Sequence, residues 1–461
     1  MSRRANPRRT RKSPQQPRTT ARQATPRAGA TPTGAAPTLA PMSARKKAVL
    51  ARAAQYVCPG RVREWHDFGI DLVIGKREGY FIWDCDGHRL IDLHLNGGNF
   101  NLGHRNPEVI AALKEALKYY DIGNHHFPSI ARAELGEFLA KHTPGDIQYA
   151  IYGSGGGEAG DIAIKSARWA TTRRKVVSII KGYHGHTGLS LMAGDARFSK
   201  LFHSEDRYGE FHQVPFNELG PMEEALKGRD VACVILETIP ATYGFPMPKP
   251  GYLEGVRDLC TKYGTVYIAD EVQTGLARTG HLWGVESYGV VPDIIVTAKG
   301  FGGGIYPITA ALCRPWVAGW LNVDGWGHVS TFGGSELGCV VAKKTVEISA
   351  RKSTLNNVKM LSEHFAKGLA DIQSRYPFLV EVRRRGVVMG LKFDHPQGAQ
   401  HVMRCLYPHG IWAIFSAYDP SALQYKVGVL VTKKLADEIL ERTEAGIRDA
   451  VKTLPKAKQA A

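Results

Sequence analysis

Val266-Tyr-Ile-Ala-Asp-Glu-Val-Gln-Thr-Gly275 is the stretch that decides the fold, because four apolar or aromatic residues lead directly into an acidic pair. A second stretch, Asp293-Ile-Ile-Val-Thr-Ala-Lys-Gly-Phe-Gly-Gly-Gly304, leads in the same way into a lysine. Short runs that are apolar almost throughout predict strands covered on both faces of a sheet. We therefore expect Asp270 and Lys299 at the ends of two buried strands, with flexible glycines after the lysine.

Similar apolar runs occur upstream of these stretches, separated by segments with helical patterning. They are Tyr149-Ala-Ile-Tyr152, Lys175-Val-Val-Ser-Ile-Ile180 and Val231-Ala-Cys-Val-Ile-Leu236. The alternation predicts an α/β fold, in which ligands bind beyond the carboxyl ends of the strands. We place a large domain at residues 96–335 and expect a smaller domain built from both terminal regions, residues 48–95 and 336–461.

Basic residues are concentrated at the N-terminus. The chain has a formal net charge of +17, of which the first 47 residues carry +12 with no acidic residue among them. Because residues 1–47 are also rich in Pro, Ser, Thr and Ala, they are predicted to form a disordered tail. A transit peptide, a weak nucleic-acid-binding arm and a misassigned start upstream of Met42 are the alternatives. Nucleic acid is disfavoured as a partner because the tail lacks interleaved aromatic residues.

The cysteines and the apolar segments bear on metal, compartment and membrane. The seven cysteines show no short paired spacing, so neither a zinc site nor a disulfide framework is indicated. We predict no metal and a reducing, cytoplasmic location. No apolar stretch reaches the roughly 18 to 20 residues of a membrane span, and the N-terminus has no apolar signal core. A membrane partner is therefore not expected.

The first candidate site is the glycine-rich segment Gly153-Ser-Gly-Gly-Gly-Glu-Ala-Gly160, which follows an apolar run and leads into helical patterning. A glycine turn at a helix N-terminus exposes backbone N–H groups that can hold a phosphate. Tight turns without a ligand also need glycine, so the motif alone leaves both interpretations open. The segment lacks the spacing and the lysine of a nucleotide-hydrolysing phosphate loop, which disfavours that function.

The second candidate is Gly182-Tyr-His-Gly-His-Thr187, which follows another apolar run. Tyr183 is suited to stack on an aromatic cofactor, and packing under a turn is the simpler alternative for a lone tyrosine. His184 and His186 have no acidic neighbours in the sequence, so they do not indicate a metal site.

Asp270 and Lys299 together indicate a chemistry. Alone, such an aspartate is most often a helix cap or a salt-bridge partner, and such a lysine is most often solvated. With a phosphate cradle upstream, the two suit pyridoxal phosphate, because a charged aspartate keeps the pyridine nitrogen protonated through a charge-assisted hydrogen bond. Lys299 then forms the Schiff base and, once a substrate amine displaces it, moves the proton between the substrate carbon and the cofactor carbon.

Several further motifs occur in a fixed order. They are Gly79-Tyr-Phe-Ile-Trp-Asp-Cys-Asp-Gly-His-Arg-Leu-Ile-Asp-Leu93, Asn101-Leu-Gly-His-Arg-Asn-Pro107, the glycine cradle, Tyr183-His-Gly185, Tyr267-Ile-Ala-Asp-Glu-Val-Gln-Thr-Gly-Leu-Ala-Arg-Thr-Gly280, Lys299 with its glycines, and Ser330-Thr-Phe-Gly-Gly334. With these motifs, residues 75–345 resemble the class III aminotransferases, fold type I pyridoxal phosphate enzymes that include acetylornithine, ornithine and omega-amino-acid transaminases. The resemblance implies a large domain with a mostly parallel seven-stranded sheet flanked by helices, and a smaller α+β domain. It implies transfer of an amino group from an amine or amino acid to a keto acid or aldehyde.

The resemblance also implies the roles of five residues around the cofactor ring. Lys299 would carry the Schiff base, and Asp270 would pair with the ring nitrogen. Val272 would pack on one face of the ring while Tyr183 covers the other, and Gln273 would contact the ring hydroxyl.

A phosphate site shared between two subunits is implied as well. Gly156 and Gly157 match the positions that bind phosphate through backbone N–H groups, and Glu158 matches a structural glutamate of the cradle. Thr331 matches a threonine that reaches the phosphate of the neighbouring subunit, which would make a homodimer obligatory. Relatives usually have Ser or Thr at the position of Gly157, so we expect phosphate binding here to depend more on the backbone.

Two departures from the family pattern concern the substrate. In the ornithine and acetylornithine group, a glutamate after a Glu-Pro-Ile-Gln run partners a C-terminal arginine that grips the α-carboxylate. This chain aligns Thr242 with the glutamate and Tyr425 with the arginine, and Lys426 is adjacent. We hypothesise that glutamate and 2-oxoglutarate are not handled in the usual way. Lys426 as a point charge, or pyruvate gripped by another residue, are the two replacements considered.

Three functions compete at this stage. An intermolecular aminotransferase is favoured. An intramolecular aminomutase similar to glutamate semialdehyde aminomutase, or a decarboxylating relative, would use the same cofactor residues and would reveal itself by an isomerised product or by carbon dioxide. A binding or regulatory protein without catalysis is the third, and the joint presence of Lys299, Asp270 and Gln273 disfavours it.

Overall fold

The computed structural model describes residues 39–124 and 126–454, which belong to one compact unit. Most of the predicted disordered tail, residues 1–38, lies outside the described residues. The prediction is wrong for the end of the tail, because helix α1 (Ala44–Tyr56) begins there with Ser43 as its N-cap. Lys46 of this helix is buried, and its ammonium group pairs with the carboxylate of Asp84 at 2.9 Å. The ion pair compensates the lysine for the water that it loses on burial.

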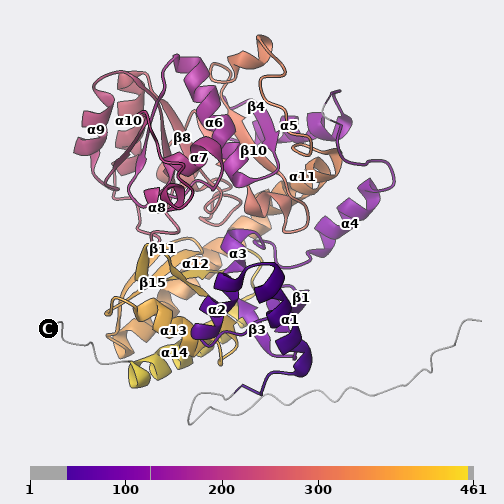
Figure 1. The fold of residues 1–461 in the computed structure, drawn as a ribbon, viewed down its shortest axis with the longest axis vertical. Coiled ribbons are helices and arrows are strands. Elements are labelled where there is room, and N and C mark those ends of the chain that lie inside the picture. Colours follow the sequence, from indigo (N-terminus) through magenta and orange to yellow (C-terminus); the bar gives the residue numbers. More distant parts are fainter. Residues whose placement is uncertain (1–38, 125, 455–461) are drawn as a thin grey trace, which may run out of the picture. The chain divides into compact units, whose positions relative to one another are not determined.

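Seven strands form one sheet in the middle of the chain (Figure 1). Across the sheet their order is β4, β10, β9, β8, β7, β5, β6. Their bounds are β4 (Tyr149–Gly153), β5 (Lys175–Ile179), β6 (Phe211–Val214), β7 (Val231–Glu237), β8 (Val266–Asp270), β9 (Ile294–Thr297) and β10 (Thr309–Cys313). β10 pairs antiparallel with both β4 and β9, and the other neighbouring strands of this sheet pair in parallel. The mostly parallel seven-stranded sheet implied by the sequence is confirmed.

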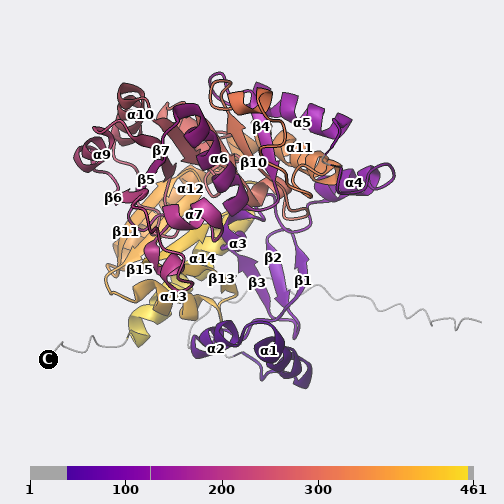
Figure 2. The same ribbon diagram turned by 45° about the horizontal axis from the view of Figure 1, so that its top comes forward.

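Helices cover both faces of this sheet, as Figure 2 shows, which explains why its strands are apolar along their length. β7 is buried at every position. Successive residues of β7 divide between two cores: Ile235 packs on the side of α6, and Leu236 packs on the opposite side. The helices involved are α6 (Gly156–Thr171) on one face, and α5 (Ile130–Lys141), α9 (Leu219–Leu226), α10 (Tyr252–Tyr263) and α11 (Glu336–Ala350) on the other.

Two four-stranded sheets form a smaller part of the fold from both terminal regions (Figure 1). The first has the order β1 (Ile74–Glu78), β2 (Phe81–Asp84), β3 (Arg89–Asp92), β13 (Ile411–Trp412), and the second β11 (Leu379–Arg385), β12 (Val388–Phe393), β15 (Asp419–Lys426), β14 (Ile414–Ser416). β3 and β13 pair in parallel, so the two ends of the chain share one sheet. A separate core packs these sheets against α12 (Lys352–Arg375), α13 (Gly398–Leu406) and α14 (Lys433–Thr453).

Shorter elements connect these layers. They are α2 (Pro59–Asp67), α3 (Leu95–Gly98), α4 (Pro107–Ala116), α7 (Gly188–Ala193), α8 (Ala196–Lys200) and the 3-10 helices η1 (Gly284–Tyr288), η2 (Lys299–Gly302) and η3 (Gly319–Asn322). Within residues 39–124 and 126–454, no helix is both long enough and apolar enough to span a lipid bilayer.

Three parallel strands bring charged residues to one edge of the large sheet. β7 ends at Glu237 and β8 ends at Asp270, and the two residues are register partners. β9 ends two residues before Lys299, which begins η2 with a φ of 46°. A left-handed backbone is uncommon for a residue other than glycine, and such strain persists where the surrounding structure enforces it. The predicted meeting of Asp270 and Lys299 at strand ends therefore holds in the structure.

Candidate active site

A cavity of about 360 Å³ opens at this edge of the sheet. Its wall is formed by loops that follow β4, β5, β8 and β9, by Glu237 at the end of β7, and by the turn before β10. The predicted site residues that line it are Gly156, Gly157, Tyr183, Asp270, Val272, Gln273 and Lys299. Thr331, the remaining predicted residue, is exposed and is not part of the wall. The structure thus gathers seven residues that are spread over four loops of the sequence.

The glycine-rich segment forms the N-terminus of α6. Gly155 is the N-cap with an extended backbone, and no side chain caps the first turn, so its N–H groups are open to a ligand. Glu158 closes the preceding turn by accepting hydrogen bonds from the N–H and the hydroxyl of Ser154, at 2.7 and 2.9 Å. A Cβ atom on Gly157 would lie 2.4 Å from the hydroxyl oxygen of Thr187. The Thr187 side chain would therefore have to shift to admit the Ser or Thr side chain that relatives usually carry there.

Asp270 is held in one orientation by two donors. It is 5% exposed, and its carboxylate accepts hydrogen bonds from Nδ1 of His184 at 2.8 Å and from the N–H of Val272 at 3.1 Å. The two donors fix the direction in which the carboxylate lines the cavity.

Lys299 reaches the cavity from the end of the neighbouring strand β9, which runs parallel to β8. Burial lowers the pKa of its ammonium group, and the negative charges of Asp270 and Glu237 partly offset this effect. Its stem lies against Gly97, where a Cβ atom would come within 2.8 Å of the lysine Cε atom. Gly97 has a φ of 73°, so glycine is needed both for its backbone and for the space that the lysine occupies.

The wall also contains polar groups without an internal partner. The side-chain oxygen of Gln273 is buried and, among the described residues, has no hydrogen-bond partner, and neither has Nε2 of His184. Buried polar atoms in native proteins are nearly always hydrogen-bonded. An unpaired one in a cavity wall therefore points to a hydrogen bond with a bound ligand. Tyr183 is half-buried beside them, and its ring meets that of His186 edge-on at 5.3 Å.

Two residues of the site were missed by sequence reasoning. His184 pairs with Asp270, although the two residues are 86 positions apart and no acidic residue lies near His184 in the sequence. Glu237 lines the cavity, is 4% exposed and has its pKa raised to about 7, chiefly by burial. Its position directly after the apolar run of β7 was the one available signal, since Asp270 follows β8 in the same way.

The residues thought to decide the substrate lie away from the cavity wall. Tyr425 is fully buried in the core of the smaller part, where its hydroxyl bonds to that of Thr443 at 2.8 Å. Lys426 points to the other face of β15, as strand alternation requires, and its ammonium group bonds to Gln424 and lies 5.2 Å from the ring centre of Phe245. Thr242 is not part of the wall, and no arginine from the described residues is.

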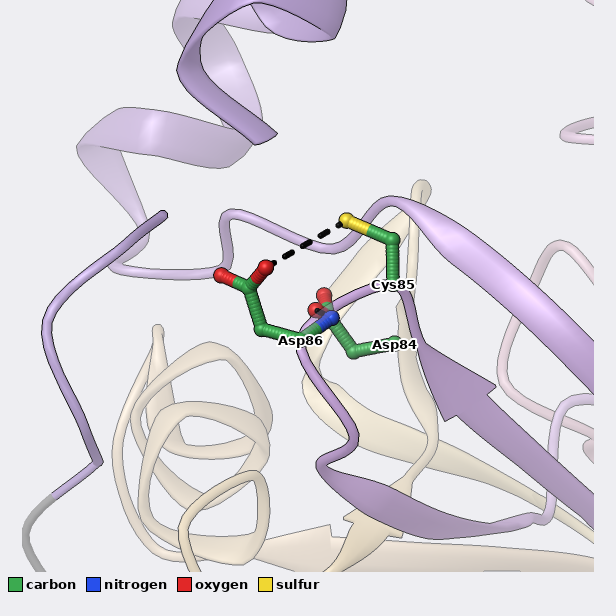
Figure 3. Close-up of side chains that lie close together, drawn as sticks. All are labelled: Asp84, Cys85 and Asp86. Atoms are coloured by element: carbon green, nitrogen blue, oxygen red, sulfur yellow. Dashed lines mark hydrogen bonds between the residues drawn. The ribbon is translucent and has the colours of Figure 1, made fainter. Parts of the chain in front are cut away.

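Asp84, Cys85 and Asp86 are the acidic and sulfur-bearing side chains that lie closest to the geometry of a metal site in the described residues (Figure 3). Their oxygens already accept hydrogen bonds within the protein. Asp84 pairs with Lys46, and Asp86 accepts hydrogen bonds from the backbone N–H and the hydroxyl of Ser43. The cluster fastens α1 to the turn between β2 and β3, and we assign it a structural role.

The chain is similar to known proteins over most of its length. The sequence profile of the aminotransferase class-III family matches residues 64–447. An uncharacterized aminotransferase of Archaeoglobus fulgidus is 44% identical over 397 residues, which cover 86% of this chain and 93% of that protein. Putrescine aminotransferase of Pectobacterium atrosepticum is 29% identical over 437 residues, which cover 91% of this chain and 92% of that protein. The ornithine aminotransferase of Toxoplasma gondii superposes with a TM-score of 0.79 at 26% identity, covering 88% of this chain and 95% of that one.

Proposed function

The chain belongs to the class III aminotransferase family, and from this premise we propose that Lys299 and Asp270 are the catalytic residues of its cofactor site. The chain is a transaminase, and its cofactor is pyridoxal phosphate, as the sequence predicted. One observation carries the residue assignment: a lysine with a lowered pKa and an oriented carboxylate face the same cavity, whose third side is an uncapped helix N-terminus.

The residues present fit the cofactor at each of its polar ends. The open N–H groups of Gly156 and Gly157 suit the phosphate, and the carboxylate of Asp270 suits the ring nitrogen. The unpaired oxygen of Gln273 suits the ring hydroxyl. Val272 and Tyr183 are the apolar and aromatic wall residues that we assign to the faces of the ring.

Each catalytic residue has a defined task in this proposal. The bound cofactor supplies an electron sink for the negative charge that forms at the substrate carbon. Lys299 attaches the cofactor covalently and, when free, removes and returns the proton at the reacting carbon, for which its lowered pKa suits it. Asp270 pairs with the ring nitrogen, and His184 donates to Asp270 and holds its orientation.

The covalent attachment is tested by chemical trapping. Reduction of the holoenzyme with sodium borohydride should fix the cofactor to the peptide that contains Lys299, as read by mass spectrometry. In the same treatment, Lys299→Ala should release the cofactor on unfolding. A label found on another lysine would refute the assignment.

We propose that the active unit is a homodimer in which Thr331 completes the phosphate site of the neighbouring subunit. Thr331 lies on an exposed loop, and large apolar side chains near it and in a second segment are also exposed. They are Val323, Trp326, Val329 and Phe332 on the loop, and Leu117, Tyr119, Ile122, Phe127 and Ile130 in the second segment. Exposed apolar groups of this number favour burial against another protein surface.

Subunit mixing tests the shared site. Lys299→Ala and Thr331→Ala homodimers should each have little activity, because every site lacks one residue. A mixed dimer has one intact site, formed by Lys299 of one subunit and Thr331 of the other, so mixing should restore activity. Failure to regain activity in verified mixed dimers would refute the shared site.

We further propose that the substrates are not the usual pair of glutamate and 2-oxoglutarate. The support is that no arginine from the described residues lines the cavity, and that Lys426, the candidate replacement, is buried with its pKa lowered well below the usual range. A neutral amine is a poor partner for a carboxylate. The similarity to a putrescine aminotransferase makes simple amines and diamines the first donors to test.

Half-reaction spectroscopy decides this point. Alanine, glutamate and simple amines are each added to the holoenzyme, and loss of the cofactor's visible absorbance reports amino transfer. A simple amine or alanine should react faster than glutamate. Rapid conversion by glutamate would refute the substrate proposal without affecting the proposal for Lys299.

We also propose that the protein is cytoplasmic. We further propose that its domains divide between residues 95 and 96 and between residues 335 and 336.

A further inference from the structure

Glu237 ties the cavity-wall loop that carries Tyr183 to the loop after β7. One of its carboxylate oxygens accepts a hydrogen bond from the N–H of Tyr183, and the other accepts one from the N–H of Ala241, both at 3.1 Å. Tyr183 belongs to the loop after β5, and Ala241 belongs to the loop after β7. The two donors come from the backbone, so the carboxylate fixes the path of both loops rather than a side-chain rotamer.

The charged form of Glu237 is what makes both contacts strong. An ionised carboxylate offers two acceptor oxygens, whereas a protonated one turns one of them into a hydroxyl. A hydrogen bond to a charged acceptor is roughly twice as strong as a neutral one. Protonation of Glu237 therefore weakens the hold on at least one loop, and one of these loops carries the tyrosine that we assign to the cofactor ring.

The charges around Glu237 place this change in the neutral range. Burial raises its pKa, His184 lowers it, and Asp270 on the adjacent strand raises it, with a result of about 7. The other titratable groups that face it are Lys299, Lys426, Tyr183 and Tyr418. Because the folded-state pKa is above the usual 4.5, Glu237 binds its proton more tightly in the folded protein, and protonation occurs without unfolding.

We propose that Glu237 is a positioning residue that holds Tyr183 against the cofactor in its ionised form and releases it when protonated. The inference rests on the proposed role of Tyr183 at the cofactor ring. Its consequence is that cofactor affinity falls as the pH drops from about 8 to about 6, beyond any change that the cofactor's own ionisation causes.

The test compares Glu237→Gln with Glu237→Asp. Glutamine keeps the shape but cannot ionise, whereas aspartate can. The dissociation constant of pyridoxal phosphate is measured by absorbance from pH 6 to pH 8.5. In the wild type it should rise about tenfold on acidification, the loss expected for one charge-assisted hydrogen bond.

Glu237→Gln should bind pyridoxal phosphate weakly at every pH, with no tenfold rise in the dissociation constant on acidification. Glu237→Asp should keep a dissociation constant that depends on pH. Tyr418→Phe, which removes a facing titratable hydroxyl, should behave as the wild type.

A second measurement separates this inference from the proposed function. In the cofactor-free protein, amide hydrogen exchange of the peptides around Tyr183 and Ala241 should be faster in Glu237→Gln than in the wild type at pH 8. An unchanged exchange rate, or a pH change in affinity that survives in Glu237→Gln, would overturn the inference. If borohydride trapping fails at Lys299 while the exchange difference is present, the proposed function fails and the contacts of Glu237 stand.

Discussion

Two lysines at strand ends, Lys299 after β9 and Lys426 at the end of β15, differ in what surrounds them. Lys299 lines the cavity, and two carboxylates raise its pKa against the effect of burial. Lys426 is 1% exposed, bonds to the neutral Gln424, and has its pKa lowered first by burial and then by the nearby cations Arg278 and Lys299. Position at a strand end is thus not enough to make a lysine reactive.

The difference lies in the access and the counter-charge of each site. Asp270 and Glu237 let Lys299 gain or lose a proton within a cavity where a substrate fits. Lys426 has no carboxylate within ion-pair distance among the described residues, and burial lowers its pKa well below the usual range. It also lies outside the cavity wall, so a substrate carboxylate in the cavity does not meet it.

The largest effect is expected on replacing the two lysines one at a time. Lys299→Ala should lower kcat/KM by at least about 10⁴-fold, because it removes both the covalent attachment and the proton transfer. Lys426→Met should change kcat/KM less than about tenfold, because the side chain does not line the cavity. Steady-state kinetics with the donor that reacts fastest in the half-reaction assay measures both. A loss of similar size in the two variants would contradict the contrast.

Asp270→Asn tests the role of the counter-charge. It keeps the shape of the side chain and removes its charge, so kcat should fall roughly 10²- to 10³-fold, the range seen when one oriented electrostatic partner is lost. The pKa of Lys299 should fall further, because Asp270 raises it in the wild type. The pH profile of covalent cofactor attachment should therefore shift to lower pH. A profile that stays in place would show that Asp270 does not act on the lysine.

Gly97→Ala tests the space around Lys299. The added methyl group would lie 2.8 Å from Cε of the lysine, so the lysine must move and kcat should fall about tenfold through misplacement. Gly87→Ala is the matched control, because Gly87 also has a positive φ, of 94°, but has open space around it. Both variants carry similar backbone strain, and only Gly97→Ala should alter kcat. Equal effects would mean that strain, not contact with Lys299, is responsible.

The cofactor side of the site was predictable because each residue belongs to a local motif. Asp270, Val272 and Gln273 lie within four residues of one another, and Gly156 and Gly157 form one turn. The structure brings these motifs together in one cavity. The seven-stranded sheet was likewise predictable from its apolar runs together with the family resemblance.

The remaining features depend on contacts between distant segments. His184 meets Asp270 across 86 positions, and Tyr183 meets Glu237 across 54. Tyr425 and Lys426 point to opposite faces of β15, both of which are buried, and a one-residue shift in register would exchange them. The helix at the end of the predicted tail is attached to the rest of the fold by the ion pair between Lys46 and Asp84. None of these contacts has a signature within a short stretch of sequence.

The smallest effect concerns the stability cost of Lys426. Lys426→Met alone would leave the side-chain amide oxygen of Gln424 unpaired, so Lys426→Met/Gln424→Leu is the informative variant. At pH 7 the unfolded chain binds a proton on Lys426 that the folded protein disfavours. The wild type should therefore gain stability as the pH rises toward the ordinary lysine pKa of about 10.5.

The double variant should be about 1 kcal/mol more stable at pH 7 and lack this rise. Urea unfolding at pH 7 and pH 9.5 measures both, with Lys434→Met as an exposed control. A double variant that is less stable at pH 7 would show that Lys426 is charged and paired in the folded protein, and the contrast with Lys299 would fail.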